Sequence, residues 1–185
     1  MKKIIMAAVA VMAFAFSNAQ EVKFGVKAGV NFANLGGDAD GSSLTGFHVG
    51  GLAEIKLSDK FAIQPEILYS AQGSDFSEDG FDDELKISYL NVPVMAKYYV
   101  IDKLSIEAGP QVGFLLSAKE EGEDAKDFLN SVDFGVNFGA GYDFTENFFA
   151  GVRYNVGLSN VADTEDSDDF KMNNSVFSVS VGYKF

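Results

Sequence analysis

The chain has 185 residues, no cysteine and a formal net charge of −13. This length predicts a single domain, and the lack of cysteine excludes a disulfide framework, thiolate metal ligands and a lipid-modified cysteine anchor. The acidic balance excludes nucleic acid as a partner, because its phosphates would be repelled.

The first residues have the pattern of a signal peptide. Two lysines precede an apolar run over residues 4–16, which is too short to cross a bilayer as a helix. Small residues follow, as a signal peptidase requires, so we expect cleavage between Ala19 and Gln20. The sequence thus divides into a signal peptide, residues 1–19, and one domain, residues 20–185.

Eight segments of this domain alternate apolar residues with polar residues or glycine, which is the period of a β-strand. In the clearest of them, Phe134 and Phe138 share one face and Asn137 lies on the other. Each segment is long enough to cross a membrane when tilted. In chain order the segments are residues 22–32, 46–57, 61–72, 90–100, 104–116, 131–144, 148–158 and 175–185.

Two features interrupt this pattern. Ile87 and Tyr89 fall on the parity opposite to the apolar face of the fourth segment, which predicts a β-bulge near Tyr89 or the end of the lipid-embedded part. Pro65, Pro93 and Pro110 each remove a hydrogen-bond donor from the sheet.

Short and long connections alternate along the chain. Three short turns share the form apolar-x-acid-Lys/Asn-apolar, at residues 57–61, 100–104 and 144–148. The four long connections, residues 33–45, 73–85, 117–129 and 159–173, carry 18 acidic and 3 basic residues. In outer-membrane barrels the short turns are periplasmic and the long loops are extracellular. This places both termini in the periplasm.

Which face of the strands contacts lipid decides between a transmembrane barrel and a water-soluble one. No lysine, arginine or acid lies on the apolar face within the segments, and one such charge at the midplane costs about 2–4 kcal/mol. Aromatic residues gather beside the short turns, as in an interfacial belt: Phe61, Tyr98, Phe144, Phe148, Tyr183 and Phe185. A water-soluble, lipocalin-like barrel is the alternative. We favour an all-β, eight-stranded, antiparallel up-and-down transmembrane β-barrel.

Several stretches resemble those of a known family. The start FGVKAGVNF (residues 24–32), the strand YLNVPVMAKYY (89–99) and the end VGYKF (181–185) look like PorT-like outer-membrane β-barrel proteins. The architecture is also similar to OmpX and to the membrane domain of OmpA. The resemblance implies an outer-membrane location and identifies Tyr183 and Phe185 as a signal for the outer-membrane assembly machinery. It assigns no activity.

Six charged residues of the polar face are predicted to lie at similar depth inside the barrel. They are Lys27, Glu54, Glu66, Lys97, Glu107 and Arg153. The interior of an eight-stranded barrel is just filled by side chains, and buried charges must pair. We therefore expect a salt-bridge layer that plugs the lumen. A gated path for protons or ions is the alternative.

Catalytic, cofactor and metal residues are not predicted. His48 is the single histidine, on the polar face toward the long connections, and Ser42, Ser43 and Asp133 are its candidate neighbours. An enzyme acting on outer-leaflet lipid would need such a group, but no motif supports one.

We expect the acidic connections to be solvated, with divalent cations, lipopolysaccharide or protein partners as candidate contacts. The leading hypothesis is a non-enzymatic structural or interaction barrel. A small-solute porin and a lipid-modifying enzyme are the alternatives.

Overall fold

The computed structural model describes residues 21–37, 42–75, 84–120, 123–126, 129–161 and 172–185. Within these ranges no helix is long and apolar enough to cross a bilayer. The described chain is built from strands, which lie as follows: β1 Glu21–Gly37, β2 Ser42–Ser58, β3 Phe61–Asp75, β4 Glu84–Ile101, β5 Leu104–Glu120, β6 Glu123–Asp124, β7 Val132–Asp143, β8 Phe148–Gly157 and β9 Met172–Lys184.

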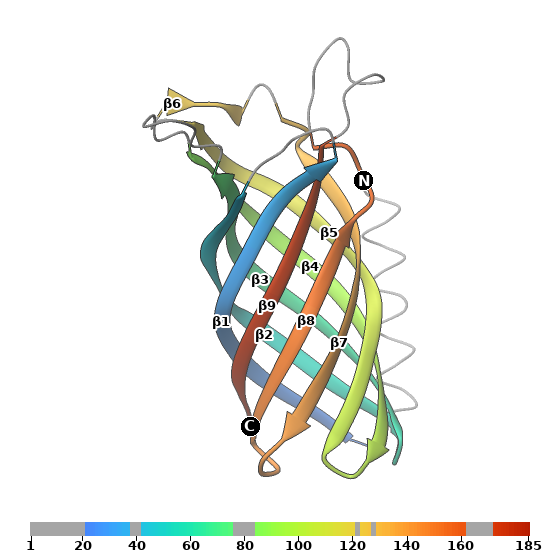
Figure 1. The fold of residues 1–185 in the computed structure, drawn as a ribbon. Helices are drawn as coiled ribbons and strands as arrows, with labels where there is room; N and C mark the ends of the chain where they lie inside the picture. The colour runs from blue at the N-terminus through green and yellow to red at the C-terminus, as the bar shows by residue number, and fades with distance from the viewer. Residues whose placement is uncertain (1–20, 38–41, 76–83, 121–122, 127–128, 162–171) are drawn as a thin grey trace.

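The strands form one closed barrel (Figure 1). Each long strand pairs antiparallel with its neighbours in the chain, and β1 pairs with β9 to close the sheet. The two-residue strand β6 pairs only with the end of β5 and does not enter the wall. The predicted all-β, eight-stranded, antiparallel up-and-down barrel is confirmed.

The strands are strongly staggered around the barrel. The line of paired residues that starts at Phe32 of β1 returns to the same strand at Val22, ten positions away. Such a stagger makes the strands tilt, as barrel closure requires. Every residue on this line is apolar: Phe32, Phe177, Tyr154, Phe138, Ala108, Ala96, Ile63, Ile55 and Val22.

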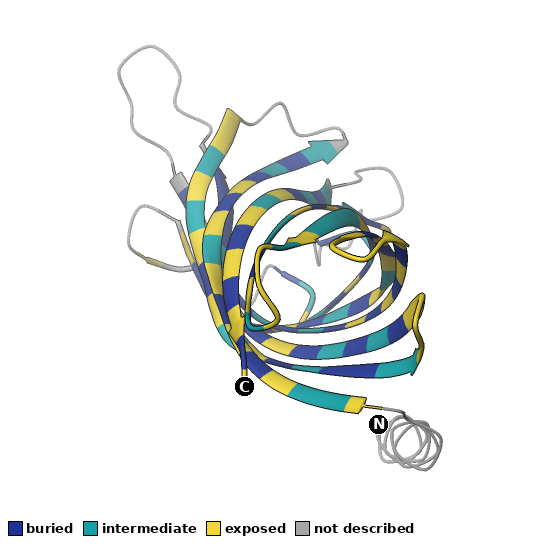
Figure 2. Ribbon diagram, turned by 90° about the horizontal axis from the view of Figure 1, so that it is seen from below, coloured by how far each residue is buried: buried dark blue, intermediate teal, exposed yellow. Residues whose placement is uncertain are grey.

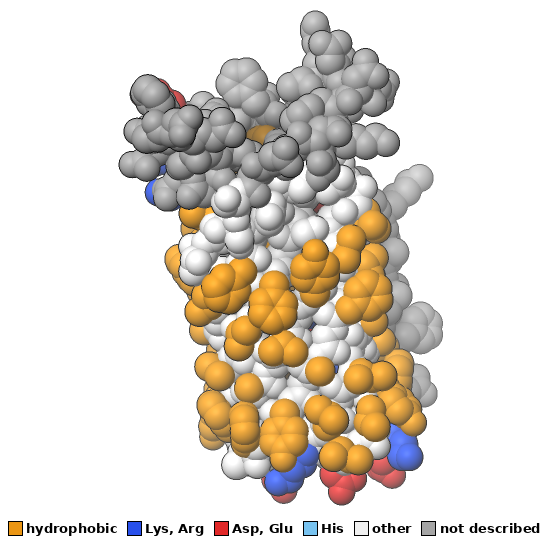
Figure 3. All heavy atoms as spheres, in the orientation of Figure 1, with side chains coloured by type: hydrophobic (Ala, Val, Ile, Leu, Met, Phe, Trp, Pro, Cys, Tyr) orange, Lys and Arg blue, Asp and Glu red, His pale blue; other side chains and the backbone are white. Residues whose placement is uncertain are grey.

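The two faces of the wall differ as the alternation predicts. Phe134 and Phe138 are 51% and 54% exposed on the outside, whereas Asn137 between them is 1% exposed. Figure 2 shows this alternation as bands of buried and exposed residues along each strand. The visible outer wall carries apolar side chains, and charged ones gather at its turn end (Figure 3).

Aromatic side chains contact one another beside the short turns. Phe144 lies 5.2 Å from Tyr142 and 5.7 Å from Phe148, measured between ring centroids. Tyr183 pairs with Phe148 and lies 5.9 Å from Phe185. Nearer the long connections, Phe32 stacks on Phe177 and Phe47 contacts Tyr69. These rings lie at both ends of the apolar wall, where interfacial belts are found.

The structure refines the expectation for Ile87 and Tyr89. The pairing between β4 and β5 does shift at Ser88 and Tyr89, but the extra residue, Leu116, belongs to β5. β4 keeps its parity, so Ile87 and Tyr89 point inward and are each 1% exposed. The strand also begins at Glu84, six residues before the predicted start.

Other expectations fall outside the described residues. These are the signal peptide with its cleavage between Ala19 and Gln20, and much of the acidic connections. They remain predictions.

Candidate functional site

The lumen is the candidate site, because the inward faces of the strands bring many polar side chains together there. Arg153 of β8 donates to Glu66 of β3 from both terminal nitrogens, at 3.0 and 2.9 Å. These strands are four positions apart in either direction around the barrel, so the pair joins opposite walls. Arg153 also donates to Glu107 at 3.1 and 2.9 Å, and Lys27 lies 3.1 Å from Glu66. We call these four residues the central network.

A second group of charges lies closer to the short turns. Glu54 accepts hydrogen bonds from Lys97 at 2.8 Å, Tyr99 at 3.0 Å and Lys184 at 3.2 Å. Lys184 also lies 3.0 Å from Asp143, which accepts from Tyr99 at 3.4 Å. We call these five residues the turn-end network.

Gln64 of β3 connects the two networks. Its side-chain nitrogen donates to Glu66 at 2.7 Å, and its oxygen accepts from Lys97 at 3.1 Å. Each network contains two cationic and two anionic side chains, so each is neutral when all are ionised. Buried charges are tolerated when they are paired in this way.

The six predicted charged residues are all buried, but they do not form one layer. Lys27, Glu66, Glu107 and Arg153 belong to the central network, and Glu54 and Lys97 to the turn-end network. Sequence reasoning missed four partners: Gln64, Tyr99, Asp143 and Lys184. All four occupy the alternate positions of their strands whose side chains point into the lumen. This alternation is the sequence signal that could have identified them.

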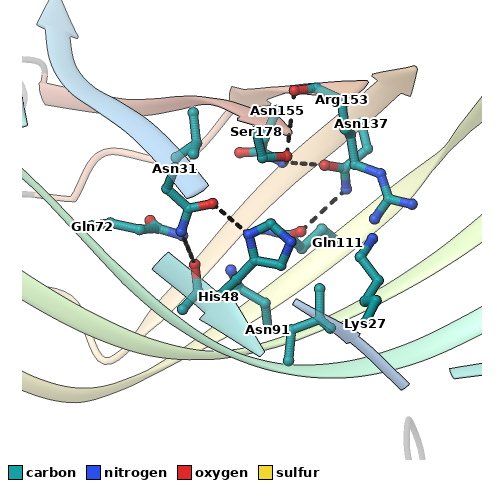
Figure 4. A pocket seen from close by; sticks show the side chains of 13 residues that line it. Lys27, Asn31, His48, Gln72, Asn91, Gln111, Asn137, Arg153, Asn155 and Ser178 are labelled. Atoms are coloured by element: carbon teal, nitrogen blue, oxygen red, sulfur yellow. Dashed lines mark hydrogen bonds between the residues drawn. The ribbon is translucent and has the colours of Figure 1, made fainter. Parts of the chain in front are cut away.

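Amide side chains line the lumen on the side of the central network nearer the long connections (Figure 4). Asn155 donates to Asn137 at 3.3 Å, and Asn137 donates to Gln111 at 3.2 Å. On the facing side Asn31 donates to Ser70 at 3.0 Å. A cavity of about 30 Å³ remains between these residues, which is room for one or two water molecules.

His48 belongs to this amide layer. Its Nδ1 lies 2.8 Å from Oδ1 of Asn31, and the residue is 4% exposed. The other candidate enzyme residues lie elsewhere: Ser42 and Ser43 are exposed near the start of β2, and Asp133 accepts a hydrogen bond from Ser159. The structure therefore places the imidazole beside an amide.

Apolar side chains fill the end of the lumen nearest the long connections, and sequence reasoning missed them. Nine buried residues form this apolar cap: Leu35, Leu85, Ile87, Tyr89, Leu115, Ala118, Ala125, Leu129 and Val161. Ala125, Leu129 and Val161 lie outside the barrel strands, so the connections themselves contribute to the cap.

The opposite end of the lumen contains a larger cavity. A cavity of about 470 Å³ lies beside the short turns. Lysines and acids line it in equal number: Lys23, Lys56, Lys103 and Lys184, with Glu54, Asp102, Asp143 and Glu146. Among the residues that the structure describes, no group of His, Asp and Glu is arranged to hold a metal ion.

A family model described as the outer membrane protein beta-barrel domain matches residues 17–163 of the chain. The chain belongs to this family. The match agrees with the closed barrel and its apolar outer wall, and it places the domain in the outer membrane, in contact with membrane lipid.

Solved structures of other proteins have the same barrel fold as this chain. Neisserial surface protein A is 17% identical, with a TM-score of 0.65 over 90% of this chain and 100% of that one. Ail, the attachment invasion locus protein of Yersinia pestis, is 15% identical, with a TM-score of 0.55 over the same shares. At these identities the likeness concerns the fold. A search of curated proteins gave no match.

Proposed function

We propose that this outer-membrane barrel has no enzymatic activity and no open channel, and that it acts through the membrane it reinforces and the acidic connections it presents outside the cell. The observation that carries the proposal is the ion pair between Arg153 and Glu66, which joins opposite walls of the lumen. A solute would have to break this pair to pass.

Three successive layers support a closed lumen. The central network joins opposite walls through Arg153 and Glu66, the turn-end network joins β4 to β7, and the amide layer joins β1 to β3. The apolar cap lies beyond them. An ion that entered would lose its hydration shell among groups that are already paired with one another, which is costly in a medium of low dielectric constant.

Single-channel recording in planar bilayers tests this proposal. We expect no steady conductance from correctly inserted protein, with insertion checked by the altered gel mobility of folded barrels. A matched insertion control is a large-pore porin reconstituted in the same lipid. Ohmic channels of constant size from the wild-type protein would overturn the closed lumen and favour the porin alternative.

We further propose that the short turns and both termini face the periplasm and that the long connections face outward. The connections carry 18 acidic and 3 basic residues. The Ail structure contains the heparin analogue sucrose octasulfate, a polyanion, and an acidic surface favours cationic partners over such a ligand. Divalent cations that bridge to lipopolysaccharide phosphates, or basic protein surfaces, are the partners with suitable charge.

Deleting each long connection in turn tests where partners bind. We expect captured partners, or calcium-dependent binding of lipopolysaccharide, to be lost with at least one deletion. Binding that survives every deletion would contradict a role for the connections.

Tyr183 and Phe185 suit the proposed signal for the assembly machinery. Tyr183 and Phe185 are 48% and 68% exposed at the turn end of β9. We expect Phe185→Ala to reduce the amount of folded protein in the outer membrane, while Phe177→Ala, in the same strand, leaves it closer to wild type. Quantifying folded protein in membrane fractions measures this, and equal amounts from both variants would contradict it.

The lack of enzymatic activity has its own test. His48→Ala should leave the mass spectrum of lipid A unchanged relative to cells with the wild-type protein. A shifted lipid A mass that depends on His48 would establish the lipid-modifying alternative.

A further inference from the structure

The outer wall contains an apolar groove that the closed lumen does not explain. A cavity of about 300 Å³ opens on the lipid-facing side across β1, β2, β3 and β4. The residues that line its outward side are Phe24, Gly51, Ala53, Pro65, Ile67 and Val92. Phe24 and Ile67 are 57% and 60% exposed, so they stand out from the wall and flank the groove.

The residue types explain why the wall is hollow here. Gly51, Ala53 and Pro65 contribute little side chain to the outward face. Pro65 also lacks the N–H that a strand neighbour would use. β3 is not paired with β2 at Ala53 or with β4 at Val92. The neighbouring pairs Leu52–Glu66 and Pro65–Val94 are formed.

The chemistry of the groove selects a hydrocarbon occupant. Its outward lining contains no charged or hydrogen-bonding side chain. Glu66 borders it from the inner side, but its carboxylate is directed into the lumen, where it pairs with Lys27 and Arg153. The groove is continuous with the lipid-facing wall, so hydrocarbon already surrounds it. An unfilled hollow forfeits dispersion contacts, and a chain that lies in it regains them.

We propose that this groove holds one acyl chain of a membrane lipid in a defined position. Pro65 is four residues from the turn end of β3 and Phe24 is three from the turn end of β1, while Gly51 and Val92 lie near the middle of β2 and β4. The groove therefore runs from the turn-side half of the wall toward its middle. Given the proposed orientation, with the turns in the periplasm, the lipid is a phospholipid of the inner leaflet. Lipopolysaccharide would reach the opposite half.

Photocrosslinking tests the proposal. The full protein is reconstituted with a phospholipid that carries a diazirine in its acyl chain, and labelled peptides are located by mass spectrometry. We expect labelling to concentrate on residues 51–67, several-fold above the opposite wall. Equal labelling of all strands would overturn the proposal.

Gly51→Leu provides the decisive variant. A Cβ at Gly51 would meet only an ordinary contact of 3.8 Å, so a side chain can begin here without a clash at its first atom. We expect this variant to lose the concentrated labelling and Ala108→Leu, on the outward face of β5, to keep it. Labelling that persists in folded Gly51→Leu protein would contradict the proposal.

A second labelling experiment tests the groove proposal and the proposed orientation separately. Lipopolysaccharide with a diazirine acyl chain is placed in the outer leaflet of asymmetric vesicles. We expect it to leave residues 51–67 unlabelled. Labelling there that Gly51→Leu abolishes would overturn the assignment to phospholipid and the periplasmic placement of the turns together, and would leave the closed lumen unaffected.

Discussion

Arg153 makes the contacts on which the proposed closure of the lumen depends most. Its guanidinium forms four hydrogen bonds to two carboxylates on different strands. A planar group with several fixed donors can satisfy two carboxylates at once, which a lysine cannot do in the same geometry. The side chain is 8% exposed, so solvent cannot replace a lost partner.

We expect Arg153→Ala to lower the free energy of unfolding by about 3–5 kcal/mol, because it leaves buried carboxylates without their main partner. Arg153→Lys should recover only part of this loss. Urea titration in lipid vesicles, followed by gel mobility, measures both.

The matched control for this pair of variants is Lys103→Ala, since Lys103 is exposed and donates only a long hydrogen bond of 3.5 Å to the carbonyl of Phe144. It should change stability by less than about 0.5 kcal/mol. Equal losses from Arg153→Ala and Lys103→Ala would contradict a structural role for the central network.

β4 shows at the scale of one element how both faces of the wall are built. Val94 and Val100 point outward and are 38% and 50% exposed. Met95, Lys97 and Tyr99 alternate with them on the inside and are buried. The sequence period predicted this assignment along the whole lipid-embedded part of the strand.

We expect Val94→Lys to destabilise the folded protein by about 2–4 kcal/mol, because it places a charge in the hydrocarbon region. Val100→Lys lies on the same face of the same strand but beside the short turn, where the cost falls to about 0–1 kcal/mol. Unfolding titrations of the two variants in identical vesicles compare them directly. A larger loss for Val100→Lys would contradict the proposed membrane position.

Residues near the long connections were harder to predict. Ile87 and Tyr89 break the sequence alternation because the inward face itself becomes apolar there. Their partners in the cap, Leu35, Leu129 and Val161, come from distant parts of the chain. A period-two pattern reports which residues share a face, but it does not report a change in what that face contacts.

At the scale of the whole molecule, the ten-position stagger decides which side chains meet. It brings Lys97 of β4 to Glu54 of β2 across the intervening strand, and Arg153 to Glu66 across the lumen. Eight strands and their faces followed from local sequence, so the barrel was predictable. The separation of the buried charges into two networks was not predictable. The depth of a side chain in the barrel depends on the tilt and stagger of the strands, which local sequence does not determine.

The proposed orientation predicts a labelling difference between the two ends of the barrel. The chain has no cysteine, so single cysteines report without background. In intact cells, a membrane-impermeant maleimide should label Ser43→Cys and leave Asp59→Cys unlabelled until the outer membrane is permeabilised. Labelling of Asp59→Cys alone would reverse the orientation and leave the fold unchanged.

The central claim is that the valine and phenylalanine face of each strand contacts lipid while the polar face lines the lumen. Spin labels at consecutive cysteine positions from residue 177 to residue 183 of β9, in reconstituted protein, test it most directly. We predict that accessibility to oxygen, which partitions into the bilayer, peaks at 177, 179, 181 and 183 and falls at 178, 180 and 182. Peaks at 178, 180 and 182 would contradict the account.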